Sequence, residues 1–572
     1  MIGYLCKYTP VEVLESMGAQ MQLMQPQVTD FNAADTMMHP NMCSYVKSVL
    51  EEMQDSEYEG IVVTTCCDSV RRLYDVLSAS YPDRFIYVLD LPRKINDFAS
   101  VMYAKRIREM ITAYERFSGR HFSADELRSA LIRNLEAGDL SHAPENKDGL
   151  RIGLVGARYS GGIRNLLDDA GVSILFDLTC SRFDRNVCPD DISEIKDDGL
   201  LDAYAHKLLS QVPCLRMADA SGRRDYIDGF SDRLDGIIYH TVKFCDNYSY
   251  EYSEMHSASD IPILKIETDL TAQCEGQIRT RIEAFLETLR ALRGDTAAGP
   301  ENKKAAGAAR KESEMTYVLG IDSGSTSTNA VIMDGNKKII AKGSVRTGAK
   351  TSGSAEKILE DILKTAGLKR EDLSMIVSTG YGRVSIPFAD MNVTEISCHG
   401  RGARYFDPDV RTILDIGGQD SKAIRLNADG EVTDFVMNDK CAAGTGRFLE
   451  AMARTLEMDI SELGPISLKS AEKVTISSMC TVFAESEVIS LIAQNREKAD
   501  IANGVHEAIS GKAMSLLRRV GLEPGYMMTG GVAKNVGVIH CLEEKLGSPL
   551  FICDDPEIVG ATGAALYALD KI

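Results

Sequence analysis

The stretch YVLGIDSGSTSTNAVIMDGNKKIIAKG, residues 317–343, sets the expected fold of the second half of this 572-residue chain. Its apolar runs predict a strand ending in an aspartate, a turn of small polar residues, a second strand, an Asp-Gly hairpin and a third strand. Such a turn lets backbone N–H groups approach phosphate oxygens, although one turn alone is more often a plain hairpin. The residues of this turn are Gly324, Ser325, Thr326 and Ser327.

The pattern recurs further along the chain. LDIGGQDSKAI (414–424) repeats the order of strand, aspartate, glycine pair, polar turn and strand. MMTGGVAKN (527–535) has a strand, a glycine pair and a helix start, and VGATGAAL (559–566) adds a helix start of small residues. Three such turns in this order resemble the superfamily of sugar kinases, heat-shock chaperones and actin.

The resemblance implies an actin-like fold in which two related lobes close over ATP or ADP with Mg²⁺. Asp322 and Asp415 would then hold Mg²⁺ and its waters, or orient the attacking water. The expected nucleotide contacts are the residues of the first turn together with Gly417, Gly418, Gln419, Gly530, Gly531 and Lys534.

Two cysteines stand at the starts of predicted helices in this half. Cys441 lies in NDKCAAGTGRFLE (438–450), and Cys480 lies in SMCTVFAESEVI (478–489). A 4Fe–4S cluster needs four thiolates, so two per chain suffice if a two-fold axis brings two chains together. The free N–H groups of a helix N-terminus stabilise the negative charge of such a cluster and its thiolates.

Together these motifs resemble the activators of 2-hydroxyacyl-CoA dehydratases and benzoyl-CoA reductases, over residues 317–572. The resemblance implies a homodimer bridged by one 4Fe–4S cluster, with Cys441 and Cys480 of each subunit as its ligands. On this interpretation the glycines after Cys441 hold no phosphate, and they let a helix begin close to the cluster. The cysteines expected to be structural here are Cys398, Cys541 and Cys553.

The segment RGDTAAGPENKKAAGAARKESE (293–314) lacks apolar periodicity and predicts a linker between domains of residues 1–292 and 315–572. Before it, β-type runs alternate with helical patterns, which predicts two parallel α/β lobes of Rossmann or flavodoxin type, at about 1–145 and 146–292. The runs lie at 2–5, 60–65, 85–90, 151–156, 173–179, 235–242 and 262–267, with a long polar helical segment at 97–138.

Most cysteines of the first half lie at predicted strand ends or in loops. In doubly wound sheets, ligand sites form beyond the carboxyl ends of the strands. Fourteen cysteines in a chain with no export signal favour metal or redox ligands over disulfides. No CxxC pair occurs in this half, so ligands would have to converge through the fold. The candidates are Cys43, Cys66, Cys67, Cys180, Cys188, Cys214 and Cys245, whereas Cys6 and Cys274 are expected to be structural.

CSYVKS, CDSVRRLYD, KFCDNYSYE and GQIRTRIEAFLE (276–287) resemble the cluster-bearing subunits of 2-hydroxyacyl-CoA dehydratases, over about residues 1–290. The resemblance implies one 4Fe–4S cluster on three cysteines, matched by Cys43, Cys67 and Cys245. The surplus cysteines favour the double-cubane cluster proteins of the same family, which hold two cubanes on six cysteines. That set would be Cys43, Cys67, Cys180, Cys188, Cys214 and Cys245, with Cys66 as an alternate, and the choice between one cubane and two stays open.

Composition and net charge limit the classes of partner that we expect for this chain. The net charge of −20 argues against nucleic acid and anionic membranes, both of which need a basic surface. No apolar run is long enough to span a membrane and the N-terminus is no signal peptide, so we expect a cytoplasmic protein. RIGLVGARYSGG (151–162) has the wrong glycine spacing for a dinucleotide fingerprint. The histidines His39, His206, His240 and His399 form no motif and are expected to be structural.

These patterns predict an electron acceptor fused to its ATP-driven donor. The second half would take an electron from ferredoxin or flavodoxin, and ATP binding and hydrolysis would move the helices that hold its cluster. The electron would pass to the cluster of the first half, which would reduce a small unsaturated molecule. The alternative is a radical 2-hydroxyacyl-CoA dehydratase with a built-in activator. A third hypothesis is a sensor or chaperone-like ATPase whose cluster only reports redox state.

Overall fold

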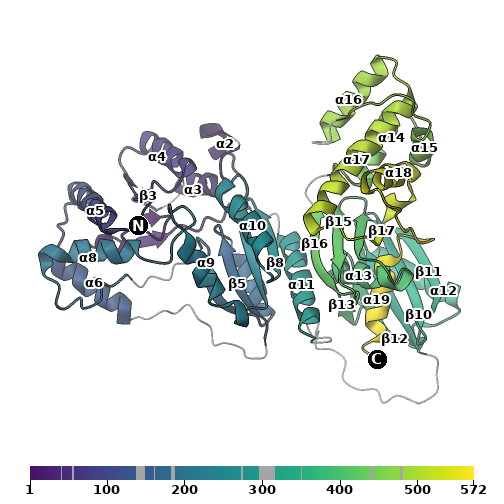
Figure 1. The fold of residues 1–572 in the computed structure, drawn as a ribbon, viewed down its shortest axis with the longest axis horizontal. Helices are drawn as coiled ribbons and strands as arrows, with labels where there is room; N and C mark the ends of the chain where they lie inside the picture. Colours follow the sequence, from purple (N-terminus) through teal and green to yellow (C-terminus); the bar gives the residue numbers. More distant parts are fainter. Residues whose placement is uncertain are drawn as a thin grey trace. The chain divides into compact units, whose positions relative to one another are not determined.

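The computed structural model describes residues 1–39, 41–54, 57–136, 149–159, 161–181, 187–271, 275–294, 316–348, 351–438, 442–476 and 481–572. The chain forms two compact units, Met1–Ile282 and Glu283–Ile572, and each is described by itself (Figure 1). The division falls inside helix α11 (Glu275–Leu292). The predicted linker lies almost wholly outside the described residues.

The first unit contains two parallel four-stranded sheets, which confirms the predicted α/β class. Their strand orders are β2-β1-β3-β4 and β6-β5-β7-β8. All seven predicted runs form strands. Among the described residues of this unit, the edge strand β2 escaped prediction, because its sequence Met-Gln-Leu contains none of the β-branched or aromatic residues that are typical of strands. The strands are β1 (Ile2–Tyr4), β2 (Met21–Leu23), β3 (Gly60–Thr64), β4 (Phe85–Leu89), β5 (Arg151–Gly156), β6 (Ser173–Leu178), β7 (Gly236–Val242) and β8 (Ile263–Thr268).

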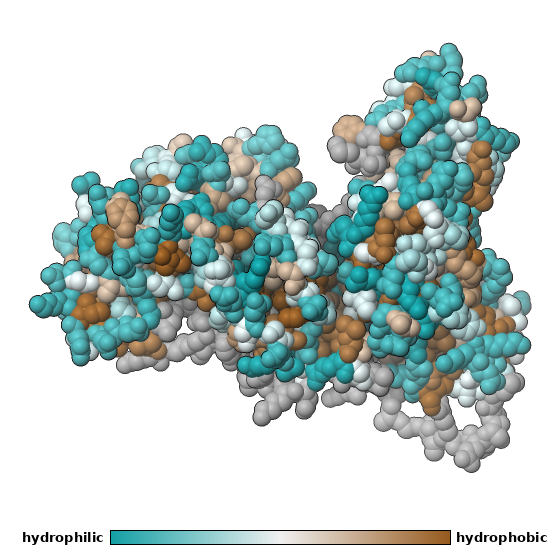
Figure 2. All heavy atoms as spheres, viewed as in Figure 1, coloured by the Kyte–Doolittle hydropathy of each residue, from teal (hydrophilic) through white to brown (hydrophobic). Residues whose placement is uncertain are grey.

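Helices pack on these sheets, and hydrophilic side chains dominate the face of the unit seen in Figure 2. The polar helical segment predicted at 97–138 is two helices, because Gly119 takes a left-handed conformation (φ 71°) and ends the first of them. Helix α8 shares one apolar core with α5 and α6. The helices are α1 (Val11–Ser16), α2 (Ala34–Met37), α3 (Ser44–Gln54), α4 (Asp68–Ser80), α5 (Asp97–Ser118), α6 (Ala124–Glu136), α7 (Gly161–Asp169), α8 (Asp197–Leu209), α9 (Ser221–Asp228), η1 (Ser231–Arg233) and α10 (Asp246–Ala258).

The second unit repeats one sheet topology twice. In the orders β11-β10-β9-β12-β13 and β16-β15-β14-β17, the first strand of each lobe pairs antiparallel with the next strand and parallel with a later one. This is the actin-like ATPase fold that the repeated turns predicted. The strands are β9 (Tyr317–Ser323), β10 (Ser327–Asp334), β11 (Ile339–Arg346), β12 (Leu373–Thr379), β13 (Met391–Asn392), β14 (Thr412–Ile416), β15 (Ser421–Leu426), β16 (Val432–Asn438) and β17 (Tyr526–Thr529).

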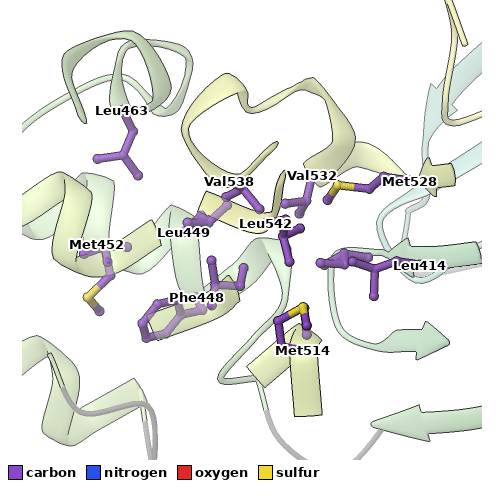
Figure 3. Close-up of a cluster of buried hydrophobic side chains, with 14 of the residues drawn as sticks. Leu414, Phe448, Leu449, Met452, Leu463, Met514, Met528, Val532, Val538 and Leu542 are labelled. Carbon is purple, nitrogen blue, oxygen red and sulfur yellow. The ribbon is translucent and has the colours of Figure 1, made fainter. Parts of the chain in front are cut away.

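The second lobe of this unit is built around an apolar core between its sheet and its helices (Figure 3). Leu414 and Met528 from the sheet meet Phe448, Met514 and Leu542 from three different helices. In the part of the chain that the structure describes, no helix is both long and apolar enough to cross a bilayer. The helices are α12 (Thr351–Ala366), η3 (Arg370–Asp372), η4 (Arg383–Ser385), α13 (Glu395–Phe406), α14 (Gly446–Thr455), α15 (Ile460–Ser467), α16 (Thr481–Ala493), α17 (Lys498–Val520), η5 (Gly531–Lys534), α18 (Val536–Leu546) and α19 (Val559–Leu569).

Candidate functional site

Two matching hairpins of the second unit carry the aspartates singled out in the sequence. Asp322 lies opposite Asn329 in the β9–β10 hairpin, and Asp415 lies opposite Lys422 in the β14–β15 hairpin. Each pair brackets one of the small-residue turns. A Cβ at Gly418 in the second turn would lie 2.0 Å from the Thr326 Oγ1 of the first, so the fold brings the two turns into contact.

A buried charge cluster surrounds the second aspartate. The Lys422 Nζ lies 2.7 Å from Asp420 Oδ2, 3.1 Å from Asp415 Oδ2 and 3.6 Å from Glu395 Oε1. The His399 Nε2 lies 3.3 Å from the other oxygen of Asp415, and its Nδ1 lies 2.9 Å from the Glu395 carbonyl oxygen. The Lys422 side chain is only 4% exposed, so these interactions act in a low dielectric, where they are strong.

The cluster shifts the pKa of each of its central members. Burial raises the pKa of Asp322 and raises that of Glu395 to about 7. Burial acts in the opposite sense on His399, but the charge of Asp415 outweighs it and raises the His399 pKa to about 9. The charges of His399 and Lys422 in turn hold the pKa of Asp415 far below its usual range, against the effect of burial. The site therefore contains one aspartate whose charged form its neighbours favour, beside carboxyls that burial makes harder to ionise.

Backbone approaches both aspartates too closely to admit a side chain. A Cβ at Gly560 would lie 2.3 Å from Asp322 Oδ2, and one at Gly380 would lie 2.4 Å from Asp322 Oδ1. Gly530 has φ 83°, and a Cβ there would lie 2.9 Å from Asp415 Oδ1. A side chain at any of these positions would collide with the carboxylates, so the site depends on glycine at all three.

The predicted nucleotide contacts lie around these two hairpins. Residues 324–327 lie at the β9–β10 turn, and residues 417–419 lie at the β14–β15 turn. Gly530, Gly531 and Lys534 follow strand β17. Lys534 pairs with Glu557 at the surface of the unit. The contacts themselves stay predictions: Gly324, Ser325, Thr326, Ser327, Gly417, Gly418, Gln419, Gly530, Gly531 and Lys534.

Sequence reasoning missed four members of the cluster: Lys422, Asp420, Glu395 and His399. Lys422 had a usable signal, because in a hairpin it faces the strand position of Asp415. Glu395 and His399 stand one helical turn apart on α13, but nothing in the sequence places that helix against Asp415. His399, expected to be structural, contacts this carboxylate directly.

The candidate cluster ligands of this unit, Cys441 and Cys480, lie outside the described residues. The helix that follows Cys441 begins against the nucleotide turn. The backbone N–H of Gly446 donates to the Gly417 carbonyl oxygen and that of Arg447 to the Gly418 carbonyl oxygen, both at 2.9 Å. The start of α14 is therefore fixed to the second turn by backbone hydrogen bonds.

In the first unit, one buried guanidinium joins cysteines from both sheets. Arg216 donates to the Cys66 Sγ at 3.5 Å and to the Cys245 Sγ at 3.7 Å. Cys66 follows strand β3 of the first sheet, and Cys245 follows strand β7 of the second. The two carboxyl-terminal sheet edges thus meet at Arg216, as expected for sites in doubly wound sheets.

A tyrosine extends this group of thiols. The Tyr248 hydroxyl lies 3.2 Å from the Cys180 Sγ and 3.9 Å from the Cys214 Sγ. Its ring centroid lies 5.7 Å from the guanidinium carbon of Arg216. Burial raises the pKa of Cys180, so this thiol is held neutral by its surroundings.

Two further cysteines complete the group. Burial raises the pKa of Cys43 to about 11, with the neighbouring Cys245 adding to the rise. The pKa of Cys67 is instead lowered to about 7, because Cys66 hydrogen-bonds to it and Arg216 is nearby. Cys67 is therefore the thiol most ready to act as a thiolate ligand.

Two cysteines lie elsewhere than the sequence suggested. Cys188 is buried in the core that contains α5, α6 and α8, and the charged groups near it are Lys207 and Asp190. Cys6, expected to be structural, lies beside the group: burial raises its pKa to about 12, and Cys66 and Cys214 add to the rise.

The donor set of the first unit fits an iron–sulfur group. Such clusters are held by Cys thiolates, and the residues gathered here are thiols around a cation that offsets anionic charge. Among the described residues, no three His, Cys, Asp or Glu side chains are placed to hold a single metal ion. A cubane takes one cysteine at each iron, so its ligands need not reach one common atom. The converging cysteines are Cys43, Cys66, Cys67, Cys180, Cys214 and Cys245.

Comparison with known proteins divides the chain into two matches. Residues 319–568 match the BadF/BadG/BcrA/BcrD ATPase family, and residues 6–137 and 129–289 match the 2-hydroxyglutaryl-CoA dehydratase D-component family. The (R)-2-hydroxyglutaryl-CoA dehydratase activating ATPase of Acidaminococcus fermentans is 48% identical over 256 residues, which cover 45% of this chain and 98% of that protein.

Two further similarities were found. The (R)-phenyllactyl-CoA dehydratase beta subunit of Clostridium sporogenes is 24% identical over 350 residues, covering 50% of this chain and 91% of that protein. The solved structure of the activator of the 2-hydroxyisocaproyl-CoA dehydratase from Clostridium difficile, with bound ADPNP, has 44% identity and a TM-score of 0.43, covering 45% of this chain and 95% of that one.

Proposed function

Because the chain belongs to the BadF/BadG/BcrA/BcrD ATPase family and carries a 2-hydroxyglutaryl-CoA dehydratase D-component domain before its ATPase, we propose that it is a self-contained ATP-driven electron-transfer protein. The second unit hydrolyses Mg²⁺-ATP and takes electrons from ferredoxin or flavodoxin. The first unit receives them and reduces a small unsaturated substrate. ATP energy enters as a change of shape, with no phosphoryl transfer to the substrate.

The observation that carries this proposal is the pair of backbone hydrogen bonds between α14 and the nucleotide turn. Gly417 and Gly418 stand beside Asp415, and they hold the first residues of the helix that follows Cys441. A movement of the turn on nucleotide binding or hydrolysis is thereby transmitted to the segment that carries a candidate cluster ligand. Asp322 and Asp415 would bind Mg²⁺ or orient water, and Lys422 keeps Asp415 ionised.

We further propose a homodimer in which Cys441 and Cys480 of both chains hold one 4Fe–4S cluster. Helix α16, directly after Cys480, exposes large apolar side chains: Val482, Phe483 and Ile489 are 66%, 63% and 55% exposed. Exposed apolar residues on one short helix mark an interaction surface. A second copy is the partner that would also bring the two missing thiolates.

In the first unit the converging cysteines would hold the accepting iron–sulfur group. That group, when bound, supplies low-potential electrons to the substrate. The chain's own contribution is electrostatic and steric: Arg216 donates to two sulfurs, the Tyr248 hydroxyl approaches two more, and burial excludes water. More than three cysteines meet here, which favours a double cubane over one open cubane.

The second candidate is a radical 2-hydroxyacyl-CoA dehydratase with its activator in the same chain. The match of the first unit to the dehydratase D-component family favours it. Anaerobic counting of iron and acid-labile sulfide in the whole chain separates the two. From the cluster types, we expect about ten irons per chain with a double cubane and about six with a single cubane. A count of about six that Cys180→Ser and Cys214→Ser leave unchanged would favour the dehydratase.

A further inference from the structure

Helix α11 supplies an acidic side chain to the ATPase unit. The division between the units falls within this helix, so its residues from Glu283 onward belong to the second unit. The carboxylate of Glu287 accepts hydrogen bonds from the Thr394 backbone N–H at 3.1 Å, from the Thr394 hydroxyl and from the Ser397 hydroxyl. Three donors from the start of one helix thus converge on one carboxylate.

These donors form the N-terminus of α13, which carries two members of the charge cluster. Thr394 is the N-cap residue of α13, and its side chain accepts no capping bond; its hydroxyl donates to Glu287. Glu287 therefore serves as an N-terminal cap supplied by another helix, with its negative charge at the positive end of the α13 dipole. Glu395 and His399, which face Lys422 and Asp415, follow within the first turns of α13.

A second acidic side chain on the same face of α11 stabilises the segment that packs against Asp322. Glu283, one helical turn before Glu287, pairs with the buried Arg383. Arg383 in turn donates from Nη1 to the Gly380 carbonyl oxygen at 3.2 Å. Gly380 packs directly against the Asp322 carboxylate. The two acids thus contact both segments that position carboxylates of the nucleotide site.

We propose that Glu287, supported by Glu283, is a positioning residue of the ATPase site that the dehydratase-like part of the chain provides. Both residues lie in the stretch that matches the dehydratase D-component family, and both precede the stretch that matches the ATPase family. The activating ATPase of Acidaminococcus fermentans is matched over 98% of its own length by an alignment of 256 residues. The inference rests on the ATPase activity in the proposed function, and it makes that activity dependent on residues before position 319.

The test uses the full chain and compares Glu287→Ala, Glu287→Gln and Thr394→Val. Loss of the cap lets the start of α13 shift, so kcat for ATP hydrolysis should fall about tenfold in Glu287→Ala, the scale of losing one helix cap near the reacting groups. The KM for ATP should change less than about twofold, because the glycine turns that meet the nucleotide are untouched. Glu287→Gln retains one acceptor oxygen for these donors, and its amide nitrogen can donate to a hydroxyl, so it should recover most of kcat. In the Glu287→Ala background, Thr394→Val should lower kcat little further, as expected for two residues that take part in one interaction.

Glu360→Ala on α12 is the matched control, because Glu360 is an exposed helical glutamate of the same unit. Unchanged kcat in Glu287→Ala, or additive losses from Glu287→Ala and Thr394→Val, would overturn the inference. If Glu287→Ala does not fold, Glu283→Gln takes its place with the same expected pattern of lowered kcat and retained KM, and unchanged kcat there overturns the inference equally. A wild-type chain that hydrolyses no ATP would instead defeat the proposed function.

Discussion

Each unit of this protein has a buried group of ionisable side chains around one cation, and the two groups differ in charge. In the second unit Lys422 is surrounded by carboxylates, and with His399 it lowers the pKa of one of them, Asp415. In the first unit Arg216 is surrounded by thiols, and burial raises the pKa of three of them: Cys43, Cys180 and Cys245. The side chains around Lys422 therefore have negative charge to offer a Mg²⁺ ion. The side chains around Arg216 instead have the positive charge of the guanidinium to offer an anionic cluster.

Because of this difference in charge, the two sites depend on different interactions for their structure. Lys422 and His399 favour the charged form of Asp415 in the folded chain, so the second site is ordered by its own ion pairs. Thiols become ligands only when they lose their protons, so the first site depends on its guanidinium and on the group it binds. Removing the central cation should accordingly damage the two units in different ways.

The largest effect is expected from Lys422→Met. This change leaves the buried Glu395 and the partly buried Asp420 without their cation, and it leaves Asp415 paired only with His399. Removing one partner of a buried ion pair typically costs about 3–5 kcal/mol of stability. Urea unfolding of the full chain, followed by a probe in the second unit, measures the loss. Lys338→Met, at an exposed position between β10 and β11, is the control. A loss below about 1 kcal/mol would mean that Lys422 does not balance this cluster.

Asp415→Asn should act on rate more than on stability. The amide keeps the shape of the side chain but removes the charge that would handle Mg²⁺ or water. ATP hydrolysis should fall at least about 100-fold, the scale of deleting one preorganised group from an active site. Iron content should stay at the wild-type value, because no cysteine contacts this residue in the described structure. Asp429→Asn in an exposed turn is the control, and retained hydrolysis in Asp415→Asn would defeat the assignment.

Arg216→Gln tests the thiol side of the comparison. The amide side chain can still donate a hydrogen bond, but it loses the positive charge beside Cys66 and Cys245. A cluster held there should become harder to reduce, with a midpoint potential lower by on the order of 50–100 mV for one electron. A redox titration monitored by electron paramagnetic resonance measures the shift. Arg224→Gln on α9, an exposed arginine paired with Glu254, should leave the potential unchanged. An unshifted potential in Arg216→Gln would show that the cluster lies away from this guanidinium.

Sequence patterns predicted the parts of the sites that local structure determines. The two aspartates and their turns follow from strand ends and small residues, and the cysteines at sheet edges follow from the parallel α/β order. Arg216 could not be predicted, because it stands in a loop that only the packing of both sheets brings to Cys66 and Cys245. The same limit applied to Cys188, which follows a segment outside the described residues and lies in a different core from most of the other candidate ligands: Cys43, Cys66, Cys67, Cys180 and Cys245.

The smallest expected effect, counted per pH unit, is a pH dependence of stability that comes from the cluster around Lys422. The folded-state pKa of Glu395 is raised to about 7 and that of His399 to about 9. A raised pKa means that the folded unit binds its proton more tightly than the unfolded chain does. The resulting stability is complete below the unfolded pKa and is lost as pH rises through the folded pKa. Glu395 should therefore reduce stability as pH rises from its ordinary value near 4.5 to about 7.

His399 should reduce the stability of the second unit further as pH rises from 6.5 to about 9. One proton per group limits the slope to about 1.4 kcal/mol per pH unit. Urea unfolding of the full chain at a series of pH values, read by a probe in the second unit, measures this slope. Glu395→Gln should flatten only the lower window and His399→Gln only the upper one. The exposed pair His540 and Glu544 on α18 provides controls, since His540→Gln and Glu544→Gln should leave both windows in place. A single window that disappears in both site variants would mean that the two groups titrate as one unit, and a rise of stability with pH would contradict the raised pKa of both.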